Sequence, residues 1–349
     1  MRRDGEKRSM MATAPELREA PSIAVVIPYF QRCAGLLHRT LSSVAAQDHS
    51  PVQVVIVDDG SPRAEGEEIT PQLRNALPGL TIISQANQGI AAARNAALDA
   101  LTGDVSAIAL LDSDDYWEAS HLRHAATALS LGADFFFSNS RIEGETTDYF
   151  LEHARRDLLY NSKPVQGAPG IATWSDGVSA LFGAGCVFRT ATVVFRRAIM
   201  PEVRFPVKLR RAGEDRLVFW ELLLRSSVIM FCTEPTLVYG RAGVGTWRNS
   251  TLGSVAHLVR LADELRVRRY VLDRYPVSPV DRRLMRRTIA NQRAAALYSA
   301  LHLLRRRRKD VFKEILYLIR SDPVCAASWC IDLPKLLYRR IRSVPVTVR

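Results

Sequence analysis

The stretch Val105-Ser-Ala-Ile-Ala-Leu-Leu-Asp-Ser-Asp-Asp115 decides the fold that this sequence predicts. Its apolar part has the length and composition of a strand covered on both faces, and it ends abruptly in acidic residues. Three earlier apolar runs, Ile23–Ile27, Val52–Val57 and Leu80–Ile83, have the same character and alternate with segments of helical spacing. This alternation predicts an α/β fold with a mostly parallel sheet flanked by helices. We expect Pro28 to end the first strand.

The composition of the 349-residue chain excludes several classes of protein. With 47% hydrophobic and 24% charged residues, the chain holds enough apolar material for a large folded domain and is not a disordered protein. No apolar run approaches the roughly 20 residues of a membrane-spanning helix, and the first twenty residues lack the apolar stretch of a signal peptide. The five cysteines are scattered and indicate reduced thiols. We therefore expect a cytoplasmic protein.

The net charge of +12 is concentrated at one end of the chain. Residues 251–349 contain 22 Lys and Arg against 8 Asp and Glu, whereas residues 1–250 contain 26 against 28. This change in composition predicts a boundary near Thr251, followed by a basic, mainly helical C-terminal extension.

The basic extension has two interpretations. The run Arg305-Arg-Arg-Arg-Lys309 precedes an apolar stripe at helical spacing, and this mixture suits an anionic membrane surface. The alternative is a helical cap that packs on the preceding domain and exposes an ordinary charged face. Nucleic-acid binding is a second class of function that the charge permits, but no known reader module is visible in the sequence.

Asp112 and Asp114 are candidate metal ligands. If the strand geometry persists beyond Leu111, their side chains project from one face while Ser113 points away. Two carboxylates suit Mg²⁺ or Mn²⁺, with water and substrate phosphates completing the coordination. The alternative is an acidic turn that caps the following helix. No P-loop and no G-x-G-x-x-G follows any strand, which disfavours a P-loop NTPase and a dinucleotide oxidoreductase.

The segment Asp58-Asp59-Gly60-Ser61 ends the second apolar run. It is either an ordinary turn or a site where a carboxylate accepts the imide N–H of a uracil ring. Arg94, a few residues into the next predicted helix, is either a contact to the nucleotide and its phosphates or a surface arginine.

Four motifs together resemble the nucleotide-sugar-binding half of family 2 glycosyltransferases, which have the GT-A fold. They are Val25-Val-Ile-Pro-Tyr-Phe30, Val57-Asp-Asp-Gly-Ser61, Asn87-Gln-Gly-Ile-Ala-Ala-Ala-Arg-Asn95 and Leu111-Asp-Ser-Asp-Asp-Tyr-Trp117. The segments 192–197 and 213–220 resemble the acceptor side of that family. The resemblance implies a nucleotide-sugar-binding half (22–125) and an acceptor-side half (126–250). We expect a flexible tail (1–21) before them and the basic extension (251–349) after them.

The resemblance also implies roles for individual residues. Asp59 falls where the family contacts the nucleobase, and Pro28, Tyr29 and Phe30 fall on the segment that lines the base pocket. Together with Arg94 and Asp112, these residues are the expected contacts of the nucleotide-sugar. Asp112 and Asp114 fall on the metal-binding D-x-D, with Asp114 as the more direct ligand. Asp215 falls on the catalytic base, and on chemical grounds we expect Glu214 beside it to orient or support it. Phe30 and Gln31 depart from the common Tyr and Asn, and no Q-x-x-R-W segment for processive synthesis is present.

These observations predict a metal-dependent, inverting hexosyltransferase-type enzyme that uses Mn²⁺ or Mg²⁺ and a nucleotide-sugar, most simply a UDP-sugar. The expected acceptor is a saccharide or lipid-linked hydroxyl in polysaccharide or glycolipid biosynthesis. The expected location is cytoplasmic, peripheral on the inner face of the membrane. The alternative is a non-catalytic GT-A-like scaffold that binds nucleic acid or an anionic surface. An enzyme that makes the nucleotide-sugar is disfavoured, because no Gly-rich basic loop follows Ile27.

Two secondary expectations concern a loop and two histidines. The segment 240–253 is either a loop that closes over the donor or an ordinary surface loop. His121 and His124 are three residues apart on a predicted helix, and we expect both to face solvent.

Overall fold

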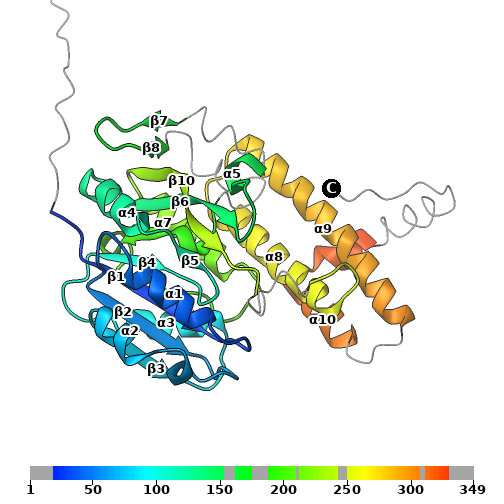
Figure 1. Ribbon diagram of the computed structural model, residues 1–349. Helices are drawn as coiled ribbons and strands as arrows, with labels where there is room; N and C mark the ends of the chain where they lie inside the picture. The colour runs from blue at the N-terminus through cyan, green and yellow to red at the C-terminus, as the bar shows by residue number, and fades with distance from the viewer. Residues whose placement is uncertain are drawn as a thin grey trace, which may run out of the picture.

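The computed structural model describes residues 19–152, 162–174, 188–209, 212–242, 250–306 and 311–329. One mixed β-sheet runs through the molecule with helices on both of its faces, and a bundle of three long helices packs beside it (Figure 1). The fold is therefore the α/β arrangement that the apolar runs predict.

The sheet has ten strands in the order β3-β2-β1-β4-β9-β6-β10-β8-β7, and β5 pairs with β10. The strands are β1 (Ile23–Tyr29), β2 (Gln53–Asp58), β3 (Leu80–Ser84), β4 (Ala107–Leu110), β5 (Tyr116–Trp117), β6 (Phe135–Ile142), β7 (Lys163–Pro164), β8 (Ile171–Trp174), β9 (Val194–Arg196) and β10 (Ile229–Tyr239). The helices are α1 (Leu36–Ala45), α2 (Pro71–Ala76), α3 (Ile90–Asp99), α4 (His121–Ser130), α5 (Tyr149–Glu152), α7 (Glu214–Arg225), α8 (Val255–Arg274), α9 (Pro279–Arg305) and α10 (Val311–Ser321).

Strand direction divides the sheet into two parts. The first four strands, β3, β2, β1 and β4, are all parallel, as their apolar runs predict. Beyond them the sheet is mixed, because β9 runs antiparallel to both β4 and β6, and β8 runs antiparallel to β10. β6 and β10 pair in parallel and run in the same direction as the first four strands, whereas β9, β8 and β5 run against them. The expectation of a mostly parallel sheet is therefore confirmed. β9 contributes just three residues, too few for a sequence pattern to reveal its direction.

Pro28 does not end the first strand, contrary to our expectation. β1 continues through Pro28 to Tyr29, which pairs with Asp58 of β2. Within β1, Tyr29 faces β2, since its carbonyl accepts from Asp59 N, whereas Val26 faces β4, since its carbonyl accepts from Leu111 N. By this alternation, the nitrogen of Pro28 faces the β4 side, where β4 has already ended. The missing N–H therefore costs no ladder hydrogen bond.

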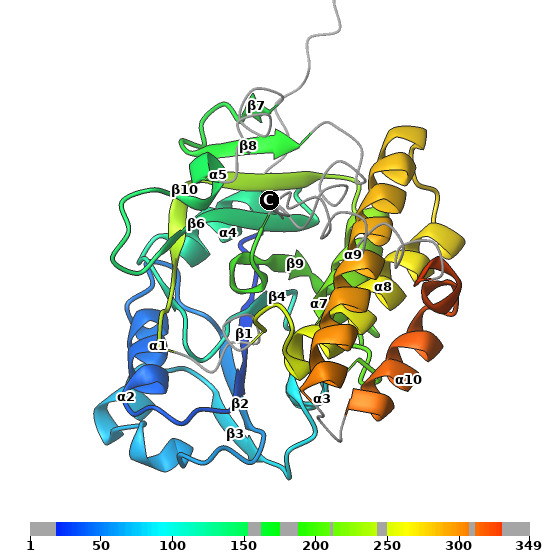
Figure 2. The same cartoon turned by 90° about the vertical axis from the view of Figure 1, so that its right-hand side faces the viewer.

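The two faces of the sheet carry separate apolar cores. α1, α2 and α4 cover one face, on which Leu37, Leu41 and Val44 of α1 bury a stripe at helical spacing. α3 and α7 cover the other face, where Ala93 and Ala97 of α3 allow close packing on the strands. Figure 2 shows α1 and α2 on one side of β1 to β3 and α3 on the other. This layering leaves the carboxyl ends of β1, β2 and β4 free to form a site.

The helices α8, α9 and α10 form the C-terminal region. Ser254 and Ser278 cap α8 and α9, because each side-chain oxygen accepts a backbone N–H of the first turn. The three helices share an apolar core of their own, and Val271 of α8 and Met285 of α9 join the core beneath α7. The region therefore packs on the sheet domain, as the helical-cap interpretation predicts. Within the described residues, no helix combines the length and apolar composition needed to cross a bilayer.

Parts of the basic extension lie outside the described residues, namely 307–310, which include the end of the basic run, and 330–349. The expected tail 1–21 is described only from residue 19. The division at 125/126 and at 250/251 stays a prediction.

Candidate functional site

Asp59 fastens the start of α3 to the end of β2. Its carboxylate accepts hydrogen bonds from Gln85 Nε2 at 2.7 Å and from the backbone N–H groups of Gln88 and Gly89, both at 2.8 Å. The side chain is buried, with 3% of the residue exposed. The predicted nucleobase contact is thus a residue whose oxygens already fix the loop that leads into α3.

Asp58 supports the same turn from its other side. Its Oδ1 accepts from the N–H of Ser61 at 2.7 Å, and Ser61 Oγ donates to the carbonyl of Gln31 at 3.0 Å. Burial raises the pKa of Asp58 to about 6, since the charged form loses hydration. These bonds join the acidic turn to the end of β1, so the two predicted base-pocket segments are held together.

The predicted base-pocket residues differ in accessibility. Pro28 and Tyr29 are buried, and Tyr29 belongs to the apolar core on the α1 side of the sheet. Burial also raises the pKa of Tyr29 to about 12. Phe30, where β1 has ended, is only half-buried. Of these three side chains, Phe30 is therefore the one available to a ligand.

The acidic segment after β4 is a turn. The strand ends at Leu110, and Asp115 N–H donates to the carbonyl of Asp112 at 3.1 Å, so the condition that strand geometry persists beyond Leu111 is not met. Nevertheless, exposure alternates as expected, because Asp112 and Asp114 are half-buried whereas Ser113 is buried. The two carboxylates are hard oxygen donors that an ion can approach, which fits Mg²⁺ or Mn²⁺.

Arg94 connects the D-x-D turn to α7 and is no surface arginine. Its guanidinium pairs with Asp112 through Nη2 at 2.8 Å and with Glu214 through Nη1 at 3.1 Å, and it lies over the ring of Phe205. Only 2% of its side chain is exposed. Burial, reinforced by the charge of Asp215, raises the pKa of Glu214 to about 7. Arg94 therefore compensates two carboxylates from distant parts of the chain.

Asp215 lies in the first turn of α7, next to this ion pair. Its Oδ2 accepts from Thr190 Oγ1 at 2.8 Å, and the side chain is half-buried. Gly213, the residue before α7, has a φ of +91°, and a Cβ there would come within 2.8 Å of Val267 in α8. The glycine thus lets α8 pack against the start of the helix that carries Asp215.

Arg189 is a cation that the sequence analysis missed. Its guanidinium carbon lies over the ring centroids of Tyr239 at 4.1 Å and Tyr149 at 4.8 Å, and Nε donates to Ser140 Oγ at 3.2 Å. No carboxylate forms a salt bridge with it among the described residues. Its partners come from β6, α5 and β10, so no local sequence pattern could have identified it.

Asp115 holds the start of the predicted donor-closing loop. Its Oδ1 accepts from the N–H of Gly240 at 2.9 Å, and burial, together with the charges of Asp114 and Asp112, raises its pKa well above the ordinary value. Residues 243–249 of that loop lie outside the described residues.

His121 and His124 are both buried, contrary to our expectation of solvated side chains. His121 stacks on Trp117 with ring centroids 4.4 Å apart, and its Nδ1 is 2.8 Å from Thr236 Oγ1. The reason is the orientation of α4, which turns this edge of the helix toward the sheet.

Comparison with known proteins identifies the family. Residues 24–189 match the model of Glycosyl transferase family 2, a range that contains both acidic turns and Arg94. The chain belongs to this family. Over 302 residues it is 26% identical to the succinoglycan biosynthesis protein ExoW of Rhizobium meliloti, covering 86% of this chain and 94% of ExoW.

Solved structures of the family share the GT-A fold. The chain is similar to Staphylococcus aureus TarS in complex with UDP-GlcNAc, with a TM-score of 0.50 and 16% identity over 88% of this chain and 91% of that one. It is also similar to the mannosyltransferase PcManGT of Pyrobaculum calidifontis in complex with GDP-Man and Mn²⁺, with a TM-score of 0.50 and 17% identity over 91% of each chain. The expected GT-A fold is confirmed.

Proposed function

We propose that this glycosyltransferase moves a sugar from a nucleotide-sugar, foremost a UDP-sugar, to an acceptor hydroxyl with inversion of the anomeric centre. The observation that carries the proposal is the Asp112–Arg94–Glu214 ion-pair chain, which joins the predicted donor turn to the helix of the predicted base, Asp215. ExoW is named for succinoglycan biosynthesis, and TarS has been solved with UDP-GlcNAc. We infer a saccharide or lipid-linked acceptor in polysaccharide or glycolipid biosynthesis.

The donor end of the site is proposed to be built from the loops after β1, β2 and β4. Phe30 offers its half-buried ring to the nucleobase, while Pro28 and Tyr29 shape the backbone beneath it. Asp59 accepts three hydrogen bonds that fix the Gln85–Gly89 loop, and this loop is proposed to border the nucleobase. A remaining lone pair of the carboxylate is proposed to accept a hydrogen bond from the base itself. Arg94 holds Asp112 in position through the hydrogen bond that its Nη2 donates to Asp112 Oδ1.

Asp112 and Asp114 are proposed to hold Mn²⁺ or Mg²⁺. Among the described residues no third carboxylate, imidazole or thiol joins them as a close cluster, which leaves the other coordination positions to water and phosphate oxygens. When bound, the ion supplies positive charge that stabilises the departing diphosphate. Arg189, which contacts two tyrosine rings and forms no salt bridge among the described residues, is proposed as a second cation for the same charge.

Asp215 is proposed to accept the proton of the acceptor hydroxyl. Thr190 donates to one of its oxygens and fixes the direction of the carboxylate, while Arg94 compensates the charge of its neighbour Glu214. A base on the face opposite the leaving diphosphate gives a single displacement, and a single displacement inverts the anomeric centre.

The C-terminal region is proposed to hold the enzyme on an anionic membrane surface, at the cytoplasmic face. On α10, Phe312 is 70% and Leu316 is 48% exposed, one helical turn apart. Lys313 and Arg320 are exposed on the same helix. Exposed apolar side chains flanked by cations favour an interface that offers both acyl chains and negative headgroups.

Calorimetric titration tests the donor class directly. UDP, GDP and dTDP would be titrated into the protein with and without Mn²⁺, and then into Asp114→Ala. We expect metal-dependent binding of one nucleotide that is lost in the variant. If none of the nucleotides binds, the alternative of a non-catalytic scaffold is favoured. A protein that binds DNA or anionic vesicles but no nucleotide would support that alternative.

A further inference from the structure

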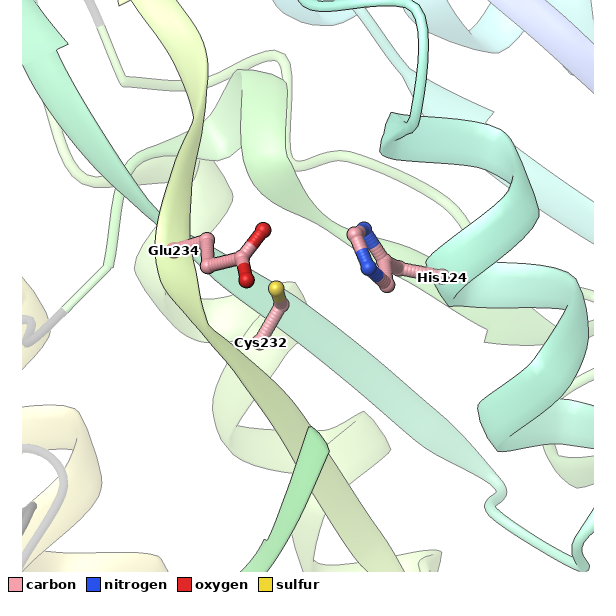
Figure 3. A group of neighbouring side chains, drawn as sticks. All are labelled: His124, Cys232 and Glu234. Atoms are coloured by element: carbon pink, nitrogen blue, oxygen red, sulfur yellow. The ribbon is translucent and has the colours of Figure 1, made fainter. Parts of the chain in front are cut away.

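A second group of ligand-type side chains lies away from the proposed transfer site. His124 on α4 faces Cys232 and Glu234 on β10, as Figure 3 shows, and one donor atom of each lies within 4.8 Å of the others. Cys232 belongs to the core on the α1 and α4 side of the sheet, whereas the helix of Asp215 covers the opposite face. No step of sugar transfer uses these three residues.

One ring nitrogen of His124 lacks the hydrogen-bond partner that its burial demands. Only 6% of the residue is exposed, and within the described part of the chain its Nδ1 has no hydrogen-bond partner. Buried polar atoms are almost always paired, and an unpaired ring nitrogen beside a thiol and a carboxylate is a place where a bound ligand would supply the missing partner.

The two residues of β10 complete the set of donors from opposite sides. Cys232 is fully buried, while Glu234 is exposed and closes the outer side of the group. Gly170, with a φ of +75°, lies beside that carboxylate, and a Cβ there would come within 3.2 Å of Glu234 Oε1. The carboxylate therefore has freedom on its solvent side and little space on the side of Gly170.

We propose that His124, Cys232 and Glu234 bind one Zn²⁺ ion. Imidazole, thiolate and carboxylate are the ligands that zinc takes in proteins, at about 2.0–2.3 Å, which places tetrahedral ligands roughly 3.3–3.8 Å apart. Donor atoms no more than 4.8 Å apart reach that geometry by small side-chain rotations, of which the exposed Glu234 is capable. Binding displaces the thiol proton of Cys232 to solvent, and a water molecule takes the fourth position.

The ion would fasten α4 to β10, two elements that already pack against each other. His124 is contributed by the helix and the other two ligands by the strand. Because such a bond exists only in the folded chain, zinc is expected to stabilise the protein by mass action. It would leave the carboxyl-end site, with its oxygen ligands, to Mn²⁺ or Mg²⁺.

The test uses the full chain, stripped with a chelator and titrated with Zn²⁺ and separately with Co²⁺. We expect one ion per chain, a thiolate-to-cobalt charge-transfer absorption and a melting temperature that rises with zinc. Cys232→Ser is expected to abolish the absorption, whereas Cys33→Ser, which removes an exposed thiol, keeps it. Asp114→Asn is expected to keep it as well, which separates this ion from the D-x-D metal.

Glu234→Ala serves as the second variant, because an exposed side chain can be truncated without unfolding the core. Loss of one ligand is expected to weaken zinc about tenfold or more, since even residues behind the ligands have effects of that size. Absence of the thiolate absorption in the unaltered chain would overturn the proposal, and so would equal zinc affinity of Glu234→Ala and the unaltered chain.

Discussion

Arg94 and Glu214 lie 120 residues apart in the sequence and form a buried ion pair of 3.1 Å. The same guanidinium holds Asp112, so one side chain fixes the relative position of the turn after β4 and the start of α7. Arginine suits this place because its planar, always charged fork serves two carboxylates at once. The predicted donor and acceptor sides of the site therefore share a single electrostatic link.

Replacing Arg94 by methionine is expected to lower the free energy of unfolding by about 3–5 kcal/mol, because Glu214 and Asp112 would lose their buried cation. Urea denaturation measures the loss. Arg204→Met is the matched control, since its salt bridge with Asp99 is half-exposed and is worth about 0–1 kcal/mol. Equal losses in the two variants would contradict the special role of Arg94.

Asp215→Asn is expected to lower kcat for sugar transfer by about 10²–10⁴-fold, because the variant cannot take the proton of the acceptor hydroxyl. Steady-state kinetics and nucleotide calorimetry check this together, since binding of the nucleotide should stay unchanged. Thr190→Val, which removes only the hydrogen bond to Asp215, is expected to have a smaller effect. A variant Asp215→Asn that keeps most of its turnover would eliminate this residue as the base.

Arg189→Met is expected to lower kcat by about 10²-fold, the usual effect of removing one group that stabilises charge in the transition state. Arg189→Lys should recover part of the activity, because it keeps the charge while losing the flat contact with Tyr239. Arg225→Met, an exposed arginine at the end of α7, is the control. If methionine and lysine variants are equally active, charge at this position plays no part.

Stability is expected to fall in acid through His121. Burial, with a smaller contribution from His124, lowers the pKa of His121 from 6.5 to about 3. Below about pH 6.5 the histidine is protonated in the unfolded chain but stays neutral in the folded protein. Its contribution to the free energy of unfolding is therefore complete above pH 6.5 and is lost as the pH falls toward 3. Its share of the slope is about 1.4 kcal/mol per pH unit.

The measurement for His121 is the free energy of unfolding between pH 4 and 8 in the unaltered chain and in His121→Phe. The phenylalanine keeps a ring against Trp117 and removes the titrating group, so the curve should flatten below pH 6.5. His38→Asn, at an exposed histidine, should retain the original slope. Parallel curves for all three proteins would contradict the prediction.

Phe312→Glu combined with Leu316→Glu is expected to abolish sedimentation with vesicles that contain phosphatidylglycerol. The change removes the exposed apolar pair of α10 and adds two negative charges beside anionic headgroups. Val280→Glu on α9, at a site 72% exposed, tests whether any exposed apolar side chain has the same effect. Unaltered vesicle binding of the double variant would remove α10 from the proposed membrane contact.

The first half of the sheet could be predicted from sequence because each strand there is a continuous apolar run between polar turns. The direction of β9 could not be predicted, because a three-residue strand has no sequence pattern that indicates its direction. Its pairing with β4 is determined by tertiary packing. Pro28 misled the prediction for a similar reason. Whether a proline interrupts a strand depends on where the neighbouring strand ends, and the residues around the proline do not indicate that position.

The candidate site divides in the same way. Asp59, Asp112 and Arg94 lie in local motifs that a sequence displays directly. The partnership of Thr190 with Asp215, and that of Arg189 with its two tyrosines, arise only when distant segments fold together. Likewise, the helical spacing of His121 and His124 indicates a shared edge but not which edge the sheet covers.

The position of β9 between β4 and β6 has a consequence for the order in which the chain folds. Val194 pairs with both Ala109 and Phe136. β4 and β6 are synthesised early, but they can pair with β9 only after that later segment has been synthesised. Until β9 has emerged from the ribosome, the edges of β4 and β6 that it covers are unpaired, and unpaired strand edges are sites of aggregation. Such distant pairing also slows folding. We therefore expect a nascent chain that ends before residue 194 to depend on chaperones.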